Sequence, residues 1–106
     1  METQNVKSDS LKETIEIENY GKKNQLPPKS TSYLIRIDKT KYIVETELIT
    51  GRELLTLANK IPVTNYRLDQ KLHGGAAKKI ELNDIVDLLS PGIERFMTLP
   101  LDQTEG

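Results

Sequence analysis

Apolar and polar side chains alternate along residues 33–38, where Tyr33, Ile35 and Ile37 share one side. The same alternation returns along residues 41–45, after a polar turn at residues 38–40. Successive side chains of a strand point to opposite faces, so the pattern predicts two half-buried strands. Because the connection between them is short and polar, we expect a β-hairpin.

A helix is predicted after the hairpin. Thr50 stands at the N-cap position, where its hydroxyl accepts a hydrogen bond from a free backbone amide, and Glu53 completes the spacing of a capping box. Pro62 lacks a backbone donor and is expected to end the helix. The apolar residues at helical spacing, which predict the buried face, are Leu54, Leu55, Leu57, Ala58 and Ile61.

The second half of the chain reads mainly as strands. Alternation predicts a strand at residues 66–72, a short strand at residues 78–82 and a last strand at residues 93–99, which Pro100 ends. Gly74 and Gly75 supply the tight turn after the first of these.

Residues 83–89 are predicted to form a single helical turn, capped by Asn83, that tucks Ile85 or Val86 under the sheet. The order is then strand, strand, helix, strand, short strand, strand. This is the β-grasp plan, in which the first and last strands lie parallel at the centre. We expect an α+β fold with a mixed sheet and one packed helix.

The chain divides by composition near residue 32. Residues 1–32 are loop-like and predict a flexible leader, followed by a domain at residues 33–99 and an extended tail at residues 100–106. Within the leader, Ile15 and Ile17 alternate with polar residues, which is typical of a strand at residues 13–18.

That leader strand suggests self-assembly. A β-grasp sheet has an unpaired edge at its second strand, which can accept a strand from another molecule. If Ile15 and Ile17 bind the edge of a second copy, the contact builds chains or filaments. The alternative is a disordered leader.

Charge and composition exclude several classes of function. The formal net charge is -1, so nucleic acid is a poor partner, and no segment is apolar enough to be a membrane span or a secretory signal. The absence of cysteine fits a cytoplasmic protein and excludes thiol chemistry. His73 is the only histidine, and Asp84 and Asp87 read as caps or solvated charges. We therefore expect no enzyme activity, no metal and no cofactor.

Over residues 33–100 the chain resembles the bacterial multi-ubiquitin domain. The motifs that carry the resemblance are IRID at residues 35–38, TGRELL at 50–55, YRL at 66–68, HGG at 73–75, VDL at 86–88 and PGIERFMTLP at 91–100. The resemblance implies a ubiquitin-like modifier that depends on partner enzymes. These are an activating enzyme of the ThiF-like adenylating type, a conjugating enzyme and in some systems a deconjugating peptidase, together with the target proteins.

A modifier reacts through its own C-terminal carboxylate, which places the chemistry at Gly106. Glycine has no Cβ to obstruct a narrow enzyme channel, and the residues before it form a tail that can leave the domain. Those tail residues are Leu101, Asp102, Gln103, Thr104 and Glu105. Two alternatives stay open: a sulfur carrier that uses a C-terminal thiocarboxylate, and a non-covalent interaction module.

The outward face of the sheet is the predicted surface for partner enzymes. Ubiquitin presents an apolar patch there, whereas the third predicted strand of this chain carries charges on its outward side. We expect partners to recognise a mixed patch of Arg67, Lys71, Arg95 and Met97.

Overall fold

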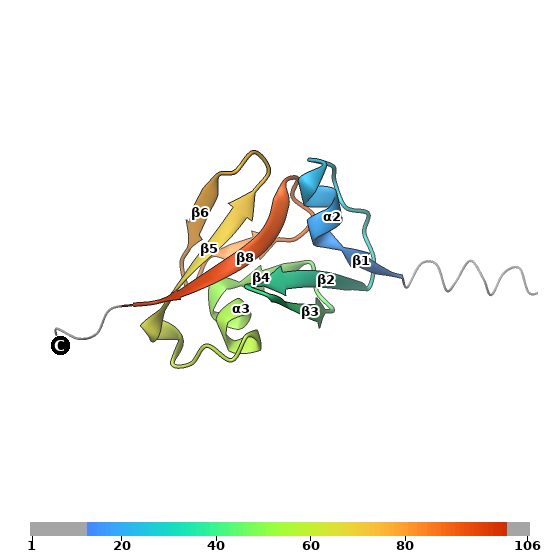
Figure 1. Ribbon diagram of the computed structural model, residues 1–106. Helices are drawn as coiled ribbons and strands as arrows, with labels where there is room; N and C mark the ends of the chain where they lie inside the picture. The colour runs from blue at the N-terminus through green and yellow to red at the C-terminus, as the bar shows by residue number, and fades with distance from the viewer. Residues whose placement is uncertain (1–12, 102–106) are drawn as a thin grey trace, which may run out of the picture.

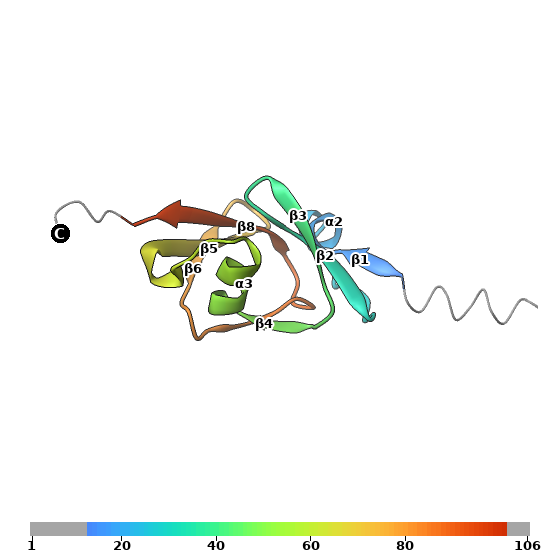
Figure 2. The same cartoon turned by 90° about the horizontal axis from the view of Figure 1, so that it is seen from below.

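Six strands form one mixed sheet in the computed structural model, which describes residues 13–101. The sheet order is β1-β2-β8-β5-β6, and β3 pairs with the free side of β2. In chain order the strands are β1 (Thr14–Glu16), β2 (Ser32–Ile37), β3 (Thr40–Val44), β5 (Tyr66–Leu72), β6 (Ala77–Ile80) and β8 (Ile93–Pro100). The helix α3 (Gly51–Leu57) lies against one face of this sheet (Figures 1 and 2).

The predicted β-grasp arrangement is confirmed. Strands β2 and β8 are neighbours and run parallel, whereas β2–β3, β5–β6 and β5–β8 are antiparallel pairs. The inward side chains of the sheet meet α3 in one core, in which Tyr33, Leu54 and Phe96 are fully buried. Burial of large apolar and aromatic side chains of this kind is the main stabilising term of a small domain.

Helix α3 begins as predicted but ends earlier. Thr50 accepts a hydrogen bond from the Glu53 amide at 3.1 Å, and the Glu53 carboxylate accepts one from the Thr50 amide at 2.9 Å. The helix ends at Leu57 because Asn59 adopts a left-handed φ of 61°, and the amides of residues 59 and 60 then close a Schellman turn. The prediction that Pro62 ends the helix was therefore wrong, and Ile61 is exposed instead of packed.

The single helical turn predicted within residues 83–89 is also wrong. Residues 85–87 form a strand, β7 (Ile85–Asp87), that pairs antiparallel with β4 (Leu48–Thr50) in a separate two-stranded sheet. The short run alternates, so that Val86 is buried between two exposed neighbours. The backbone of β4 is available as a pairing partner, and this decides in favour of a strand over a helical turn. The local sequence of residues 83–89 contains no information about that partner.

Small differences remain at other boundaries. Strand β8 continues through Pro100, which pairs with Tyr66, because a proline at the end of a strand loses one donor without breaking the pairing. Residues 63–65 form the short 3-10 helix η1 (Val63–Asn65). Gly74 and Gly75 have φ values of 90° and 94°, as the predicted tight turn requires.

The N-terminal segment differs most from the sequence prediction. The strand expected at residues 13–18 spans only β1 and is followed at once by the helix α2 (Ile17–Lys22). Strand β1 pairs in parallel with the start of β2, and Ile17 is 1% exposed within the core. Residues 14–22 therefore belong to the folded domain, so it begins before residue 33, and Ile15 and Ile17 lie against their own sheet instead of on the edge of a second copy.

Helix α2 fills a gap between the two central strands. Strand β8 is registered with β2 at one position, Ile37 with Phe96, and the strands separate towards the start of β8 (Figure 1). Gly21 fits there because any side chain would collide with β8: a Cβ would stand 1.8 Å from the carbonyl oxygen of Ile93. A glycine that costs helix stability is thus required by the close approach of two backbones.

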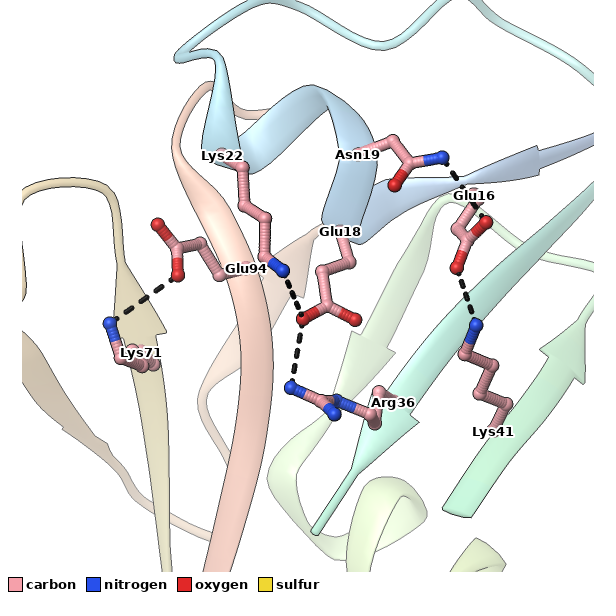
Figure 3. A network of polar contacts seen from close by, with 8 residues as sticks. All are labelled: Glu16, Glu18, Asn19, Lys22, Arg36, Lys41, Lys71 and Glu94. Carbon is pink, nitrogen blue, oxygen red and sulfur yellow. Dashed lines mark hydrogen bonds and ion pairs between the residues drawn. The ribbon is translucent and has the colours of Figure 1, made fainter. Parts of the chain in front are cut away.

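Ion pairs of Glu18 also help to hold α2 in place. The buried Glu18 carboxylate accepts a hydrogen bond from Arg36 of β2 at 2.9 Å and lies 3.5 Å from Lys22 of its own helix (Figure 3). A buried carboxylate without such partners would be strongly destabilising. The sequence of α2 therefore matches the gap in both shape and charge.

We predict that Gly21→Ala lowers the free energy of unfolding by about 2 kcal/mol, since the added methyl must push α2 away from β8. In an ordinary exposed helix the same exchange stabilises by about 1 kcal/mol, so the sign is diagnostic. Urea unfolding followed by circular dichroism measures the change. The control is Asn19→Ala at an exposed position of α2, which should change stability by less than about 0.5 kcal/mol. A Gly21→Ala variant as stable as wild type would contradict the close docking.

Candidate partner surface and C-terminal exit

Alternation along β5 and β8 sorts their side chains onto two faces. Leu68, Gln70 and Phe96 point into the core, which leaves the intervening residues on the face opposite α3. The pairs that share this outer face are Arg67 with Leu99, Asp69 with Met97 and Lys71 with Arg95. The structure therefore brings the four predicted residues, Arg67, Lys71, Arg95 and Met97, onto one surface, here named the outer face.

Two of the predicted cations are neutralised by neighbours. Arg67 donates hydrogen bonds to both carboxylate oxygens of Asp69, from Nε at 3.0 Å and from Nη2 at 3.1 Å. The hydrogen bond to Asp69 and its negative charge raise the pKa of Arg67 above its ordinary value. Lys71 pairs with Glu94 at 3.3 Å. The exposed surface is accordingly of mixed charge instead of basic.

Arg95 differs from the other two cations, because it has no ion pair with any residue in the described range 13–101. Leu99 lies beside Arg67 and is 59% exposed, which adds an apolar element to the same surface. The predicted recognition patch did not include Leu99, Asp69 or Glu94. Strand parity places Leu99 and Asp69 there, whereas the irregular register of β5 and β8 between Lys71 and Leu72 brings Glu94 beside Lys71.

Ion pairs continue across the neighbouring strands. Figure 3 shows the Lys71–Glu94 pair, the Glu18 group on α2 and the Glu16–Lys41 pair at 2.8 Å in one view. Opposite charges therefore alternate from β5 across α2 to β3. This pattern favours partners with a complementary arrangement of charge over partners that bind an apolar patch.

Strand β8 carries the chain out of the domain. Pro100 still pairs with Tyr66, and the Leu101 amide donates a hydrogen bond to the Asn65 carbonyl at 2.8 Å. In Figure 1 this end lies on the side of the molecule away from β1. The predicted tail residues Asp102, Gln103, Thr104 and Glu105 and the predicted conjugation residue Gly106 lie outside the described residues.

The remaining polar candidates have structural roles. His73 Nδ1 lies 3.2 Å from the Lys22 carbonyl oxygen, next to the turn. Asp84 accepts a hydrogen bond from the Glu81 amide, and Asp87 accepts one from the Leu89 amide. Within residues 13–101, no three metal-ligating side chains gather at one place. None of the described helices has the length and apolar character needed to cross a membrane.

Comparison with known proteins agrees with the fold. The model of the multiubiquitin family matches residues 33–100, which is more than half of the chain. Neither the curated proteins nor the solved structures gave a match. The matched range covers the strands β2 to β8 and α3, including the outer face and the exit of β8, and so the chain belongs to the multiubiquitin family.

Proposed function

We propose that this chain is a cytoplasmic ubiquitin-like modifier that partner enzymes activate at Gly106 and transfer to target proteins. Membership of the multiubiquitin family is the observation that carries the proposal. The path of β8 supports it, because this central strand ends at the edge of the domain and its exposed successor, Leu101, leads directly into the tail. The chain itself is not an enzyme in this proposal.

The chemistry follows the established logic of carboxylate activation. The Gly106 carboxylate attacks the α-phosphate of ATP and releases pyrophosphate, which leaves an acyl adenylate. A cysteine thiolate of a partner enzyme displaces AMP to form a thioester, and an amine or hydroxyl of the target displaces the thiolate. Every step needs the tail end inside a confined catalytic site, where a residue without Cβ meets the least steric resistance.

The geometry of the exit limits how far the tail can reach. Backbone pairing holds the chain to the domain as far as Leu101. The five residues 102–106 can then span at most about 17 Å at ~3.3 Å per residue. An activating enzyme must therefore bring its active site close to the domain, which makes the surface beside the exit the natural place for it to bind.

The outer face provides that surface. Arg67 and Leu99 are opposite each other on β5 and β8, next to the last residues of β8. We propose that the activating enzyme contacts the outer face through Arg67, Lys71, Arg95 and Met97, with Leu99 as an additional apolar contact. The guanidinium of Arg95, which has no ion pair within residues 13–101, is available for a carboxylate of the enzyme, and bidentate pairing favours arginine at such positions.

We predict that Gly106→Leu abolishes covalent products of the chain, because the added side chain obstructs adenylate and thioester formation. The measurement is mass spectrometry of the tagged chain isolated from its native host. In a modifier, the Gly106 carboxyl is joined to a target with loss of water, as an isopeptide or ester. Glu105→Ala is the control and should leave the products in place.

Other results would point to the alternatives. Sulfur in place of one oxygen at the Gly106 carboxyl identifies a sulfur carrier. Free chain without any covalent change, under conditions in which the partner enzymes are expressed, favours a non-covalent module. Conjugates that survive Gly106→Leu would contradict the assigned attachment point.

We predict that Arg67→Glu combined with Arg95→Glu reduces kcat/KM for activation at least about tenfold, because like charges then meet at the contact. The assay is ATP–pyrophosphate exchange by the activating enzyme at increasing concentrations of the chain. Lys29→Glu combined with Lys39→Glu is the matched control, since it makes the same change of net charge outside the outer face. Equal loss in both variants, or no loss in either, would rule out recognition through the outer face.

A further inference from the structure

Strands β3 and β6 are the two ends of the main sheet (Figure 1), so each has one edge without a neighbouring strand in the described part of the chain. A free edge presents backbone donors and acceptors that can pair with another chain, and proteins usually protect it with charges. Strand β6 is protected in this way, since it contains Lys78 and Lys79 and no acidic residue. Strand β3 carries Lys41, but it also presents Ile43, which is 61% exposed, and Glu45 follows it directly.

The β2–β3 hairpin determines which backbone groups of β3 face outward. Ile37 and Thr40 pair across a two-residue turn and therefore exchange backbone hydrogen bonds, which recur at every second residue of an antiparallel ladder. The even-numbered residues of β3 thus bond to β2, whereas Lys41, Ile43 and Glu45 direct their backbone groups to the free edge. The side chains of these three residues also share one face of the sheet, because positions two apart in a strand do so.

We propose that two copies of this chain pair through β3, antiparallel and about a two-fold axis at Ile43. In this register the two Ile43 side chains are opposite each other, and Lys41 of each copy is opposite Glu45 of the other. A two-fold contact needs a surface that is complementary to itself, and the order of cation, apolar residue and anion provides one. Opposite charges directly across a strand pair are stabilising, whereas like charges are destabilising.

The sequence of the edge favours this register over its neighbours. Sliding one copy by two residues is the smallest step that keeps the same backbone groups paired. In one direction it places Ile43 opposite Lys41, and in the other direction it places Ile43 opposite Glu45. Both shifts remove the two pairs between Lys41 and Glu45, so the charges select the register in which the isoleucines meet.

Both charged residues are available to a second copy. Glu45 is exposed and has no ion pair within residues 13–101. Lys41 pairs with Glu16 of β1 at 2.8 Å, and its side chain remains 52% exposed. An ammonium group has three donors, so Lys41 can bind Glu16 of its own copy and Glu45 of the second copy together.

The side of β3 that faces α3 gains contacts as well. In the proposed register, Tyr42 of each copy is opposite Val44 of the other, at positions where side chains come closest because no backbone bonds join them. An aromatic residue beside a β-branched one is a favourable cross-strand pair. Val44 borders an apolar groove of about 450 Å³ between β3 and α3, with Ile49 and Leu57 among its other walls. Tyr42 of the second copy would cover the open end of this groove.

The proposed dimer leaves the outer face open, since β2 lies between β3 and the strands that carry that face. The inference does not depend on conjugation through Gly106. Only residues 41–45 of each copy pair, which places the contact among small and transient interfaces, and we expect a dissociation constant of about 100 µM.

The test is sedimentation equilibrium of the full chain from about 10 µM to about 1 mM, a range that brackets the expected constant. The average mass should rise from that of one chain towards that of two and no further, because a two-fold contact closes on itself. Ile43→Lys places two ammonium groups opposite each other and should weaken association at least about tenfold. The side chain of Ile43 is exposed, so this variant should keep the fold, which circular dichroism checks.

Charge reversal tests the register. Lys41→Glu alone brings carboxylates together and Glu45→Lys alone brings ammonium groups together, so each variant should associate at least about tenfold more weakly than wild type. An equimolar mixture of the two variants should regain dimers. In the mixed dimer the introduced carboxylate faces the introduced ammonium, and the remaining Lys41 and Glu45 face each other. Weaker folding of Lys41→Glu beside Glu16 cannot produce this recovery, since the same protein is present in the mixture.

Glu81→Lys is the matched control, because it makes the same change of net charge at an exposed position outside β3 and should associate like wild type. Several results would overturn the proposal. These are a wild type that stays a single chain up to about 1 mM, a mass that grows beyond two chains, and association that survives Ile43→Lys. A mixture without recovery, or equal weakening by Glu81→Lys and Glu45→Lys, would exclude the proposed register.

Discussion

The narrow junction between β2 and β8 governs the whole structure. The two strands share a single registered pair, and the contact continues through the residue after β2: the Asp38 amide donates a hydrogen bond to the Phe96 carbonyl at 2.8 Å. The Asp38 carboxylate in turn accepts hydrogen bonds from the amide and hydroxyl of Thr98, at 2.9 and 2.6 Å. These part-buried bonds to a charged acceptor join the β2–β3 hairpin to the β8–β5–β6 half of the sheet. Because the junction is short, the sheet opens on one side of it, and α2 must close that opening.

The same junction sets the geometry of the end at which we propose conjugation. Since β8 is held at its middle by Asp38 and along its length by β5, the strand leaves the domain in a fixed direction. The outer face is fixed with it, because strand parity places Arg67 and Lys71 on the same side as Met97. In the proposed function, an enzyme that contacts this face therefore meets Leu101 at a defined position, and such preorganisation lowers the cost of binding.

Sequence reasoning succeeded where a local pattern is sufficient and failed where a distant partner decides. Strand β5 spans residues 66–72 as predicted, and the Thr50 capping box formed, because alternation and capping are local properties. Nothing local in residues 17–22 indicates a helix, because the segment contains a glycine and precedes a loop. The shape of the gap beside Ile93 selects the helix. In the candidate site, parity placed the four outer-face residues correctly, whereas the neutralising contact of Glu94 with Lys71 depends on a cross-strand geometry that sequence alone does not contain.

The alternation of side chains along β5 gives the two sides of this strand different roles. Arg67, Asp69 and Lys71 point outward, whereas Leu68 and Gln70 point inward and are buried. The side chains that would meet an enzyme and those that pack the core are therefore separated by the thickness of one strand. The backbone of β5 is held on both sides along most of its length by β6 and β8. These two neighbours keep the side chains of the outer face in one register relative to the end of β8, so the surface proposed for the activating enzyme and the start of the tail move as one unit.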